Sequence, residues 1–450
     1  MRAFNVTEEN ASLFVDLYEL TMAAAYWSNH VNGIATFELY FRRLPPNRSF
    51  ILAAGLEQML EYLCNLHFTG QQVDWLQKHK AFESVDSGFF DYLRDFRFSC
   101  DVWAVPEGTP IFPLEPMVQV RGPLIEAQIV ETYLLSMLSM QSMIATKAAR
   151  IAHAAKGRSV VDFGSRRAHG PQAGLLAARA SYIGGCIGTS NVLAGELGEI
   201  PIYGTAAHSF TMAFGSELEA FQSYNRVFPA NTTLLIDTYD VEKAAHKVKE
   251  VPNVNAVRID SGNLFDLSKK VREILDHDQL QKVQIMVSGD LNEFKIAELA
   301  QQDAPIDSFG VGTELVTSYD APGISVVYKM VTATIAGQET STVKTSEGKL
   351  SYPQRKQIYR FRKNGQFSRD EICEFDESPS ERGEPLLQQY LQAGRCIQEM
   401  PKLSEVRRYA SMQLDSLSDS MRKISAVEAY PVTLSQKLQS ELARMQKRNL

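Results

Sequence analysis

The chain has 450 residues, of which 44% are hydrophobic and 22% are charged, so it is a folded globular protein with room for two or three domains. Its formal net charge is −7, so no broad basic surface favours nucleic acid or an anionic membrane as a partner. Any anionic ligand must be bound by local positive charge.

The cysteines and the N-terminal segment bear on the cellular compartment. There are five cysteines without CxxC spacing: Cys64, Cys100, Cys186, Cys373 and Cys396. This pattern argues against a disulfide framework and against a zinc site built from cysteines. The first residues hold no signal-like apolar core, and no apolar run reaches the roughly 18 residues that span a bilayer. We expect a soluble, cytoplasmic protein.

Residues 1–115 mix helical and strand patterns. The segments "DLYELTMAAAYW" (16–27) and "LAAGLEQMLEYLCNL" (52–66) have helical periodicity, whereas "ATFELYFRRL" (35–44) is typical of a strand. We therefore predict an N-terminal α+β domain.

From residue 116 to 335, short apolar runs alternate with helical segments. The strand candidates are "SVVDFG" (159–164), "TTLLIDT" (232–238), "NAVRID" (255–260), "VQIMVSGD" (283–290) and "IDSFGVGT" (306–313). Such alternation predicts an α/β fold with parallel strands. Most runs end in Asp, Gly, Ser or Thr, and β/α barrels bind ligands in the loops after their strands. We expect the functional site there.

Residues 336–450 form a third segment. The stretch 332–361 is typical of strands joined by turns, and we expect helices near "EPLLQQYLQAG" (384–394) and at the C-terminus. We predict that this segment packs partly against the N-terminal domain.

His208 lies in "GTAAHSF" (204–210), and no other motif in the chain supplies it with metal-binding partners. The eight histidines include no HExxH or HxH pair, and neither a GxSxG elbow nor a GxxxxGK[ST] loop is present. An isolated histidine is ordinarily packed or hydrogen-bonded.

Three further loops are candidates for anion binding. Arg166 lies in "GSRRAHGPQAG" (164–174), which matches no dinucleotide fingerprint and reads either as a helix-entry loop or as an anion site. Two later loops, "SGDL" (288–291) and "FGVGTEL" (309–315), hold small residues whose N–H groups can approach a phosphate. Taken alone, each is more often a plain strand-to-helix turn.

Arg258 and Asp260 occupy positions i and i+2 of "VRIDSGNL" (257–264), so they share one face of a strand. An arginine fork there suits a carboxylate or phosphate, and an aspartate can accept hydrogen bonds from ribose hydroxyls. The alternative is a buried Arg–Asp pair with a structural role.

Taken together, these motifs resemble the nicotinate phosphoribosyltransferase family. The resemblance rests on "DLYELTMAAAYW", "FELYFRRLPPNRSFILAAGLEQMLEYL", "DFGSRRAHGPQAG", "GTSNVLAG", "GTAAHSF", "LLIDTYD", "VRIDSGNL", "VSGDL" and "FGVGTELVTS", in the family's order, and "YPQRKQIYRF" extends it to residue 361. One departure is Gln354, where the family usually has glycine.

The resemblance implies a type II phosphoribosyltransferase, with an irregular α/β barrel beside a sandwich-like N-terminal domain. Members join nicotinate to phosphoribosyl diphosphate, giving nicotinate mononucleotide and diphosphate for NAD biosynthesis. ATP hydrolysis is coupled through a phosphohistidine, whose motif matches His208, and Mg²⁺ is bound mainly through the substrate phosphates. The active sites are shared in a homodimer.

The family pattern also implies roles for single residues. For the base it implies Phe163 and Tyr18 as ring contacts, Tyr18 reaching the site of the neighbouring subunit, with Arg258 at the carboxylate and Thr205 nearby. For phosphoribosyl diphosphate it implies Asp260 at the ribose hydroxyls, Asp237 near the metal and diphosphate, and Arg166 at phosphate oxygens. The loops for the 5-phosphate would be formed by Gly289, Asp290, Gly312 and Thr313.

Three alternatives stay open. A nicotinamide-specific relative carries an aspartate in the loop where this chain has Ser190, and serine does not repel a carboxylate, which favours nicotinate. A quinolinate phosphoribosyltransferase uses no ATP and leaves the His208 motif unexplained. A non-catalytic barrel scaffold would also keep the fold.

Overall fold

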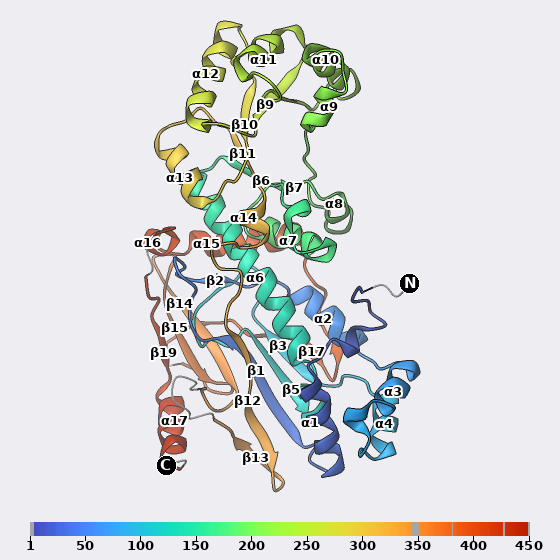
Figure 1. Ribbon diagram of the computed structural model, residues 1–450. Coiled ribbons are helices and arrows are strands. Elements are labelled where there is room, and N and C mark those ends of the chain that lie inside the picture. Colours follow the sequence, from blue (N-terminus) through green and yellow to red (C-terminus); the bar gives the residue numbers. More distant parts are fainter. Residues whose placement is uncertain (1–3, 344–350, 380, 426–427, 449–450) are drawn as a thin grey trace.

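The protein is described here by a computed structural model that covers residues 4–343, 351–379, 381–425 and 428–448. Figure 1 shows an α/β body built on a parallel sheet at one end and an antiparallel sheet at the other, joined by one long helix. No helix among the described residues is both long enough and apolar enough to cross a lipid bilayer.

The antiparallel sheet draws its strands from the beginning, the middle and the end of the chain. Its order is β13 (Gln338–Ser341), β12 (Val326–Ile335), β1 (Ile34–Phe41), β5 (Val118–Pro123), β3 (Asp101–Ala104), β17 (Gln388–Gln392) and β18 (Arg395–Cys396). Seven of the eight residues of β1 are buried, which explains the apolar and aromatic character of this strand. The strand predicted within residues 35–44 is confirmed.

A second, mixed sheet packs beside the first. It contains β16 (Glu384–Pro385), β14 (Lys356–Lys363), β15 (Gln366–Glu374) and β19 (Val432–Leu434), and in it β15 and β19 pair in parallel. Ile358 of β14 lies in one core with Leu39 and Val118, and the buried pair Lys356–Glu38 links the sheets at 2.6 Å. A short pair, β2 (Ile51–Leu52) and β4 (Pro110–Ile111), lies above them.

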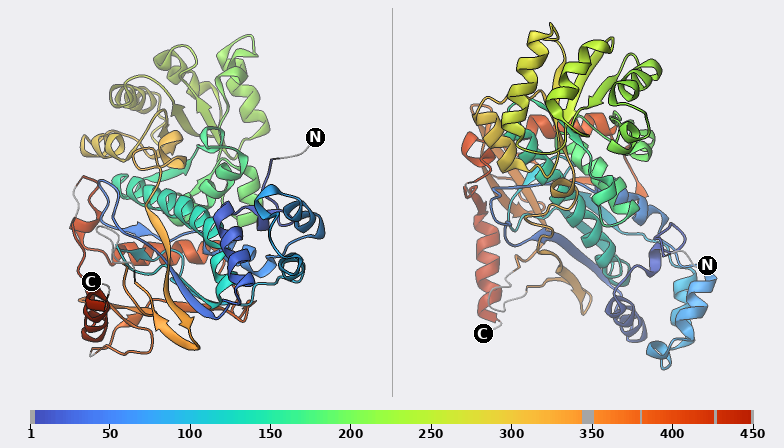
Figure 2. Two further views of the ribbon diagram at one scale, coloured as in Figure 1. Left: turned by 60° about the horizontal axis from the view of Figure 1, so that its bottom comes forward. Right: turned by 45° about the horizontal axis from the view of Figure 1, so that its top comes forward.

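The parallel sheet is a curled half-barrel. Its order is β7 (Gly188–Thr189), β6 (Ser159–Asp162), β11 (Ser308–Val311), β10 (Gln284–Val287), β9 (Val254–Ile259) and β8 (Thr232–Leu235). The predicted α/β barrel class is confirmed, and among the described residues no ladder joins β7 to β8. Buried residues of the helices that follow the strands, such as Ala177, Val271 and Ile296, share one core with the strands, and Figure 2 shows these helices around the sheet.

Helix α6 (Glu131–Ala154) connects the two halves. Its first half places Leu134 and Leu138 in the core of the antiparallel sheet, and its second half places Ile144 and Ile151 in the core of the half-barrel. A helix of 24 residues is about 36 Å long, so this one element spans both layers.

The remaining helices complete the layers. They are α1 (Leu17–Ser28), α2 (Leu56–Asn65), α3 (Gly70–Gln77), α4 (Ser87–Arg94), α5 (Leu124–Gln128), α7 (Pro171–Ile183), α8 (Val192–Gly198), α9 (His208–Met212), α10 (Glu217–Val227), α11 (Val241–Lys247), α12 (Leu264–His277), α13 (Glu293–Gln301), α14 (Thr313–Val316), α15 (Leu403–Asp415), α16 (Asp419–Arg422) and α17 (Gln436–Arg448). The 3-10 turns are η1 (Ala11–Leu13), η2 (Lys80–Phe82), η3 (Ser165–Arg167) and η4 (Val248–Glu250).

One secondary-structure prediction is wrong. The segment 384–394 is not helical, because it forms β16 and β17, and β17 pairs antiparallel with β3. Tyr390 and Leu391 are buried there against the main antiparallel sheet. Pairing with an existing strand therefore overrides the helical propensity of the leucines and glutamines.

Candidate active site

The polar residues at the carboxyl ends of the parallel strands lie at one edge of the half-barrel. Phe163 follows β6, Asp237 follows β8, Asp260 follows β9, Ser288 follows β10 and Gly312 follows β11. Parallel strands in register bring their carboxyl ends to the same edge, so this edge is the rim that the strand pattern predicted.

Arg258 is the centre of the polar contacts at this rim. Its Nε donates to Ser288 Oγ at 2.8 Å, its Nη1 to Thr205 Oγ1 at 2.8 Å and its Nη2 to Asp260 Oδ1 at 2.5 Å. A guanidinium has five N–H donors, so these three bonds leave two for a ligand. The prediction that Arg258 and Asp260 share one face is confirmed, and the pair is only partly buried.

The ring of Phe163 lies beside the same guanidinium. The Arg258 Cζ atom is 5.3 Å from the ring centroid. Gly310 makes room for the ring, because a Cβ at Gly310 would lie 2.5 Å from a ring carbon of Phe163. An aromatic face, a cation and the Thr205 hydroxyl therefore converge on one place.

Asp260 is held in its ionised form. Burial acts to raise the pKa of this carboxyl, but the hydrogen bond from the Ser288 hydroxyl and the charge of Arg258 outweigh it, so the pKa is lowered. The backbone N–H of Asp260 also donates to Asp237 Oδ2 at 3.0 Å. The two aspartates are thus fixed relative to one another.

His208 is the first residue of α9 and lies over Asp237. Its Nδ1 is 3.2 Å from Thr238 Oγ1, and its Nε2 is 4.0 Å from Asp237 Oδ1. The His208 side chain is 38% exposed, whereas the Asp237 carboxylate is buried and its Oδ1 has no hydrogen-bond partner among the described residues. An exposed imidazole above an anchored carboxylate is an arrangement suited to nucleophilic or acid–base chemistry.

The two predicted phosphate loops adjoin Asp260. Gly289 has a φ of +101°, and a Cβ there would lie 2.2 Å from the Asp260 carbonyl oxygen, so only glycine fits. Among the hydrogen bonds of the described residues, none is donated by the backbone N–H of Gly289, Asp290 or Thr313. These loops, with Gly312 at the start of the second, can offer free N–H groups to an anion.

Ser190 and Arg166 lie on the same rim. The backbone N–H of Ser190 donates to the Asp162 carbonyl oxygen at 2.8 Å, and the side chain is exposed. Arg166, in η3, is exposed, and no polar partner of its side chain is found among the described residues. Both side chains are accessible at the end of β6 and β7.

Tyr18 is the predicted site residue that the structure does not bring to this rim within one chain. It lies on α1, which Figure 1 places at the base of the molecule, far from the parallel sheet. Burial raises the pKa of the Tyr18 phenol, and the neighbouring Glu131 adds to the effect through its charge and a hydrogen bond. The Tyr18 side chain remains 44% exposed.

Two residues of the site were not identified from the sequence. Ser288 bridges Arg258 and Asp260, and Asp162 accepts hydrogen bonds from Thr189 Oγ1 at 2.7 Å and from the N–H of Gly164 at 2.8 Å. Burial raises the pKa of Asp162. In the sequence, the only sign of a role for these two residues was their position at the ends of predicted strands.

The described part of the chain contains no cluster of three or more His, Cys, Asp or Glu residues that could hold a metal ion. A divalent cation could still use the unpaired oxygen of Asp237, because carboxylate oxygens suit hard cations such as Mg²⁺.

Three family models match successive parts of the chain. Residues 13–139 match the family model of the nicotinate phosphoribosyltransferase (NAPRTase) N-terminal domain, and residues 380–442 match that of its C-terminal domain. Between them, residues 144–322 match the quinolinate phosphoribosyl transferase C-terminal domain.

Two curated relatives extend over nearly the whole chain. Nicotinate phosphoribosyltransferase pncB2 of Mycobacterium tuberculosis is 44% identical over 449 residues, covering 98% of this chain and 95% of that protein. The nicotinate phosphoribosyltransferase of Bacillus subtilis is 35% identical over 470 residues, covering 97% and 95%. The crystal structure of human nicotinic acid phosphoribosyltransferase superimposes with a TM-score of 0.83 at 29% identity, covering 96% of this chain and 99% of that one.

Proposed function

Because the chain belongs to the nicotinate phosphoribosyltransferase family, we propose that it joins nicotinate to 5-phosphoribosyl 1-diphosphate, forming nicotinate mononucleotide and diphosphate in NAD biosynthesis. The observation that carries the proposal is the convergence of Arg258, Phe163 and Thr205 at the rim. A pyridine carboxylate needs an aromatic face and a cationic fork at this spacing.

In the base pocket, Phe163 stacks on the pyridine ring and the two free N–H donors of Arg258 bind the carboxylate. Thr205 and Ser288 hold the guanidinium in place. Ser190 lies at the neighbouring strand end, where an uncharged side chain does not repel the acid. This combination favours nicotinate over nicotinamide.

At the reacting carbon, the bond from ribose C1 to the diphosphate oxygen breaks and the pyridine nitrogen bonds to C1. The transition state resembles an oxocarbenium ion, so catalysis depends on positioning and on charge at the leaving group. Asp260, held ionised, accepts hydrogen bonds from the ribose hydroxyls, and the exposed Arg166 faces phosphate oxygens. The free N–H groups of the loops at Gly289 and Thr313 hold the 5-phosphate.

Mg²⁺ bound through the diphosphate would neutralise the charge of the leaving group. Asp237 fits beside it, because its Oδ1 is a buried carboxylate oxygen with no hydrogen-bond partner among the described residues. This makes Asp237 an anchor for the diphosphate end of the substrate.

We further propose that ATP hydrolysis is coupled to this reaction, which makes it an ADP-forming, ligase-type reaction. The His208 imidazole attacks the γ-phosphoryl group, ADP leaves, and the phosphohistidine is later hydrolysed to phosphate. The exposure of His208 and its position above Asp237 support this role.

The last part of the proposal concerns assembly and location. Tyr18 is exposed and lies far from the rim of its own chain, which supports a homodimer in which it completes the neighbouring active site. All five cysteines are free thiols, which supports a cytoplasmic location.

One assay tests the proposed function. The purified protein is incubated with phosphoribosyl diphosphate, Mg²⁺ and either nicotinate, nicotinamide or quinolinate, with and without ATP, and mononucleotide, ADP and diphosphate are measured. We expect turnover of nicotinate, accelerated by ATP with ADP release. Turnover of nicotinamide or quinolinate alone, or of no base, would reject the proposal in favour of the corresponding alternative.

A further inference from the structure

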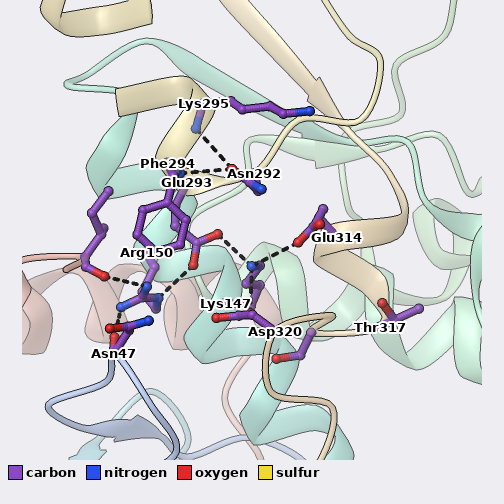
Figure 3. Close-up of polar contacts among 12 residues, drawn as sticks. Asn47, Lys147, Arg150, Asn292, Glu293, Phe294, Lys295, Glu314, Thr317 and Asp320 are labelled. Carbon is purple, nitrogen blue, oxygen red and sulfur yellow. Dashed lines mark hydrogen bonds and ion pairs between the residues drawn. The ribbon is translucent and has the colours of Figure 1, made fainter. Parts of the chain in front are cut away.

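A buried ionic cluster lies behind the two loops that face Asp260. The Lys147 ammonium, on α6, is 2.6 Å from Glu293 Oε2, 2.8 Å from Asp320 Oδ1 and 3.4 Å from Glu314 Oε2. Figure 3 shows this ammonium between the three carboxylates. The Lys147 side chain is 1% exposed and that of Glu293 is fully buried.

Two of these carboxylates lie in the first turns of the helices that follow the loops at the rim. Glu293 is the first residue of α13 and follows the Gly289–Asp290 turn by three positions, while Glu314 directly follows Thr313. Lys147 therefore contacts the ends of both loops, although these loops follow different strands.

The loop before α13 is also fastened to its own helix. Asn292 Oδ1 accepts from the backbone N–H groups of Phe294 and Lys295, and the Lys295 ammonium donates to the Asp290 carbonyl at 2.8 Å. Arg150 Nε holds the other oxygen of Glu293 at 2.9 Å. These bonds tie Asp290, the neighbour of Gly289, to the first turn of α13, which contains Glu293.

The third carboxylate ties the cluster to the antiparallel layer. Asp320 accepts from both terminal nitrogens of Arg48, each at 3.0 Å, and Arg48 precedes β2. Burial opposes ionisation of Asp320, but Arg48 and Lys147 outweigh it and lower its pKa. Its charge is therefore retained, and three cations face three anions in the cluster.

We propose that Lys147 is a positioning residue that sets the distance between the two loops binding the 5-phosphate of phosphoribosyl diphosphate. The inference rests on the proposed function only in assigning the 5-phosphate to these loops. Without the ammonium, Glu293 and Glu314 would lose the cation that they share, and the free N–H groups of Gly289 and Thr313 would move apart.

The test compares Lys147→Met, which keeps the stem and removes the charge, with Lys147→Arg, which restores a cation. Arg360→Met is the matched control, because Arg360 and Asp370 form an equally buried ion pair at 2.6 Å in the β14–β15 sheet, away from the loops. Binding of ribose 5-phosphate is measured by titration calorimetry, together with the KM values of both substrates and the melting temperature.

We expect Lys147→Met to weaken ribose 5-phosphate and to raise the KM of phosphoribosyl diphosphate by about tenfold or more, since small displacements of binding groups have effects of this size. The KM of nicotinate should change less than about twofold, and Lys147→Arg should recover part of the loss. Arg360→Met should lower the melting temperature without weakening ribose 5-phosphate.

Glu314→Gln provides a second route if Lys147→Met does not fold, because Glu314 is 20% exposed and neutralising it leaves the stronger contacts in place. It should weaken ribose 5-phosphate to a smaller extent. Unchanged ribose 5-phosphate affinity in folded Lys147→Met or in Glu314→Gln, or an equal loss in Arg360→Met, would overturn the inference. A failure of nicotinate turnover in the wild type with these binding results intact would reject the proposed function alone.

Discussion

At the scale of single residues, the contacts of Arg258 separate binding of the base from binding of phosphoribosyl diphosphate. Two protein hydroxyls and one carboxylate fix the guanidinium, and its Cζ atom lies 5.3 Å from the centroid of the Phe163 ring. A change at Arg258 should therefore affect the KM of nicotinate more than the KM of phosphoribosyl diphosphate.

Arg258→Ala should raise the KM of nicotinate steeply. Loss of hydrogen bonds to a charged carboxylate costs about 1.5–3 kcal/mol, or roughly 10- to 150-fold in affinity. The KM of each substrate is measured in steady state. Arg258→Lys is the control, because it keeps the charge but loses the planar fork, and its KM for nicotinate should lie between those of wild type and Arg258→Ala. An unchanged KM for nicotinate would put the carboxylate elsewhere.

His208→Asn should abolish ATP coupling while leaving slow, ATP-independent nucleotide formation. Wild type treated with γ-labelled ATP should acquire an acid-labile, base-stable label, because a phosphoramidate is cleaved once protonated. The variant keeps a polar side chain of similar reach, so it should fold but not be labelled. An acid-stable label on another residue, or ADP release still coupled to product in the variant, would contradict the phosphohistidine.

Sequence reasoning located the strand ends and most of the rim residues, because strand periodicity and polar termini are local signals. It did not identify Ser288, whose importance comes from bridging Arg258 and Asp260 across adjacent strands. That contact depends on the register of β9 and β10, which no local pattern encodes.

At the scale of elements, the turn before β14 has a left-handed residue. Gln354, where we expected a departure from the family pattern, has a φ of 65°, and its carbonyl accepts from the Lys356 ammonium at 2.7 Å. The departure seen in the sequence therefore falls on a backbone conformation that glycine adopts more easily.

Gln354→Gly should leave the protein as stable or slightly more stable, whereas Gln354→Val should lower the free energy of unfolding by about 1–2 kcal/mol, because a β-branched residue is strained at this φ. Denaturant midpoints measure the difference. Gln366→Gly in strand β15 is the control and should be destabilising, since glycine weakens a strand. If Gln354→Val were at least as stable as Gln354→Gly, the turn would have to change its backbone conformation without strain.

The contact between α1 and α6 should make stability depend on pH. Burial raises the pKa of Glu19 from 4.5 to about 7, even though Thr132 donates to this carboxyl. Because the pKa is raised in the folded state, the contribution of Glu19 to the free energy of unfolding is complete below pH 4.5 and is lost as the pH rises through 7.

Glu19→Gln should therefore gain stability relative to wild type between pH 5 and pH 8, by up to about 3 kcal/mol for a shift of this size. Unfolding midpoints of both proteins at the two pH values test it. Glu8→Gln, at an exposed position, is the control and should show no such gain. Parallel pH profiles for wild type and Glu19→Gln would mean that Glu19 is ionised in the folded state.

The segment 384–394 marks the limit of prediction for elements. Its leucines and glutamines favour a helix locally, yet β17 pairs with β3, almost 300 residues earlier, and buries Tyr390 and Leu391. The α1, α2 and α17 helices were predicted correctly because their apolar faces follow the helical period within one segment.

At the scale of the whole molecule, helix α6 connects the antiparallel layer to the half-barrel. Tyr18, the predicted contact of nicotinate, lies in the antiparallel layer, away from the rim. Arg48, Lys147 and Asp320 fix the half-barrel to the antiparallel layer, so Tyr18 cannot reach Phe163 of its own chain by a small loop movement. If Tyr18 contacts nicotinate, it must do so from a second copy in a symmetric dimer.

Mixing two inactive variants tests this arrangement. Tyr18→Ala removes the proposed ring contact, which comes from the antiparallel layer. Arg258→Ala removes the guanidinium that binds the carboxylate at the rim. Each homodimer therefore has two defective sites. In a mixed dimer with shared sites, one site receives both defects and the other receives none. A purified mixed dimer should then show about half of wild-type activity at low nicotinate, since one of its two sites is intact.

The assay is run after co-expression with two different affinity tags, so that mixed dimers are purified and their activity is compared with that of each homodimer. Phe163→Ala mixed with Arg258→Ala is the control, because both residues lie on the same rim and no arrangement of two chains gives an intact site. Restored activity with Tyr18→Ala but not with Phe163→Ala would establish that the site is completed by the second chain. A monomeric wild type, or no recovery in purified mixed dimers, would refute the shared site and leave Tyr18 with a role in packing against Glu131.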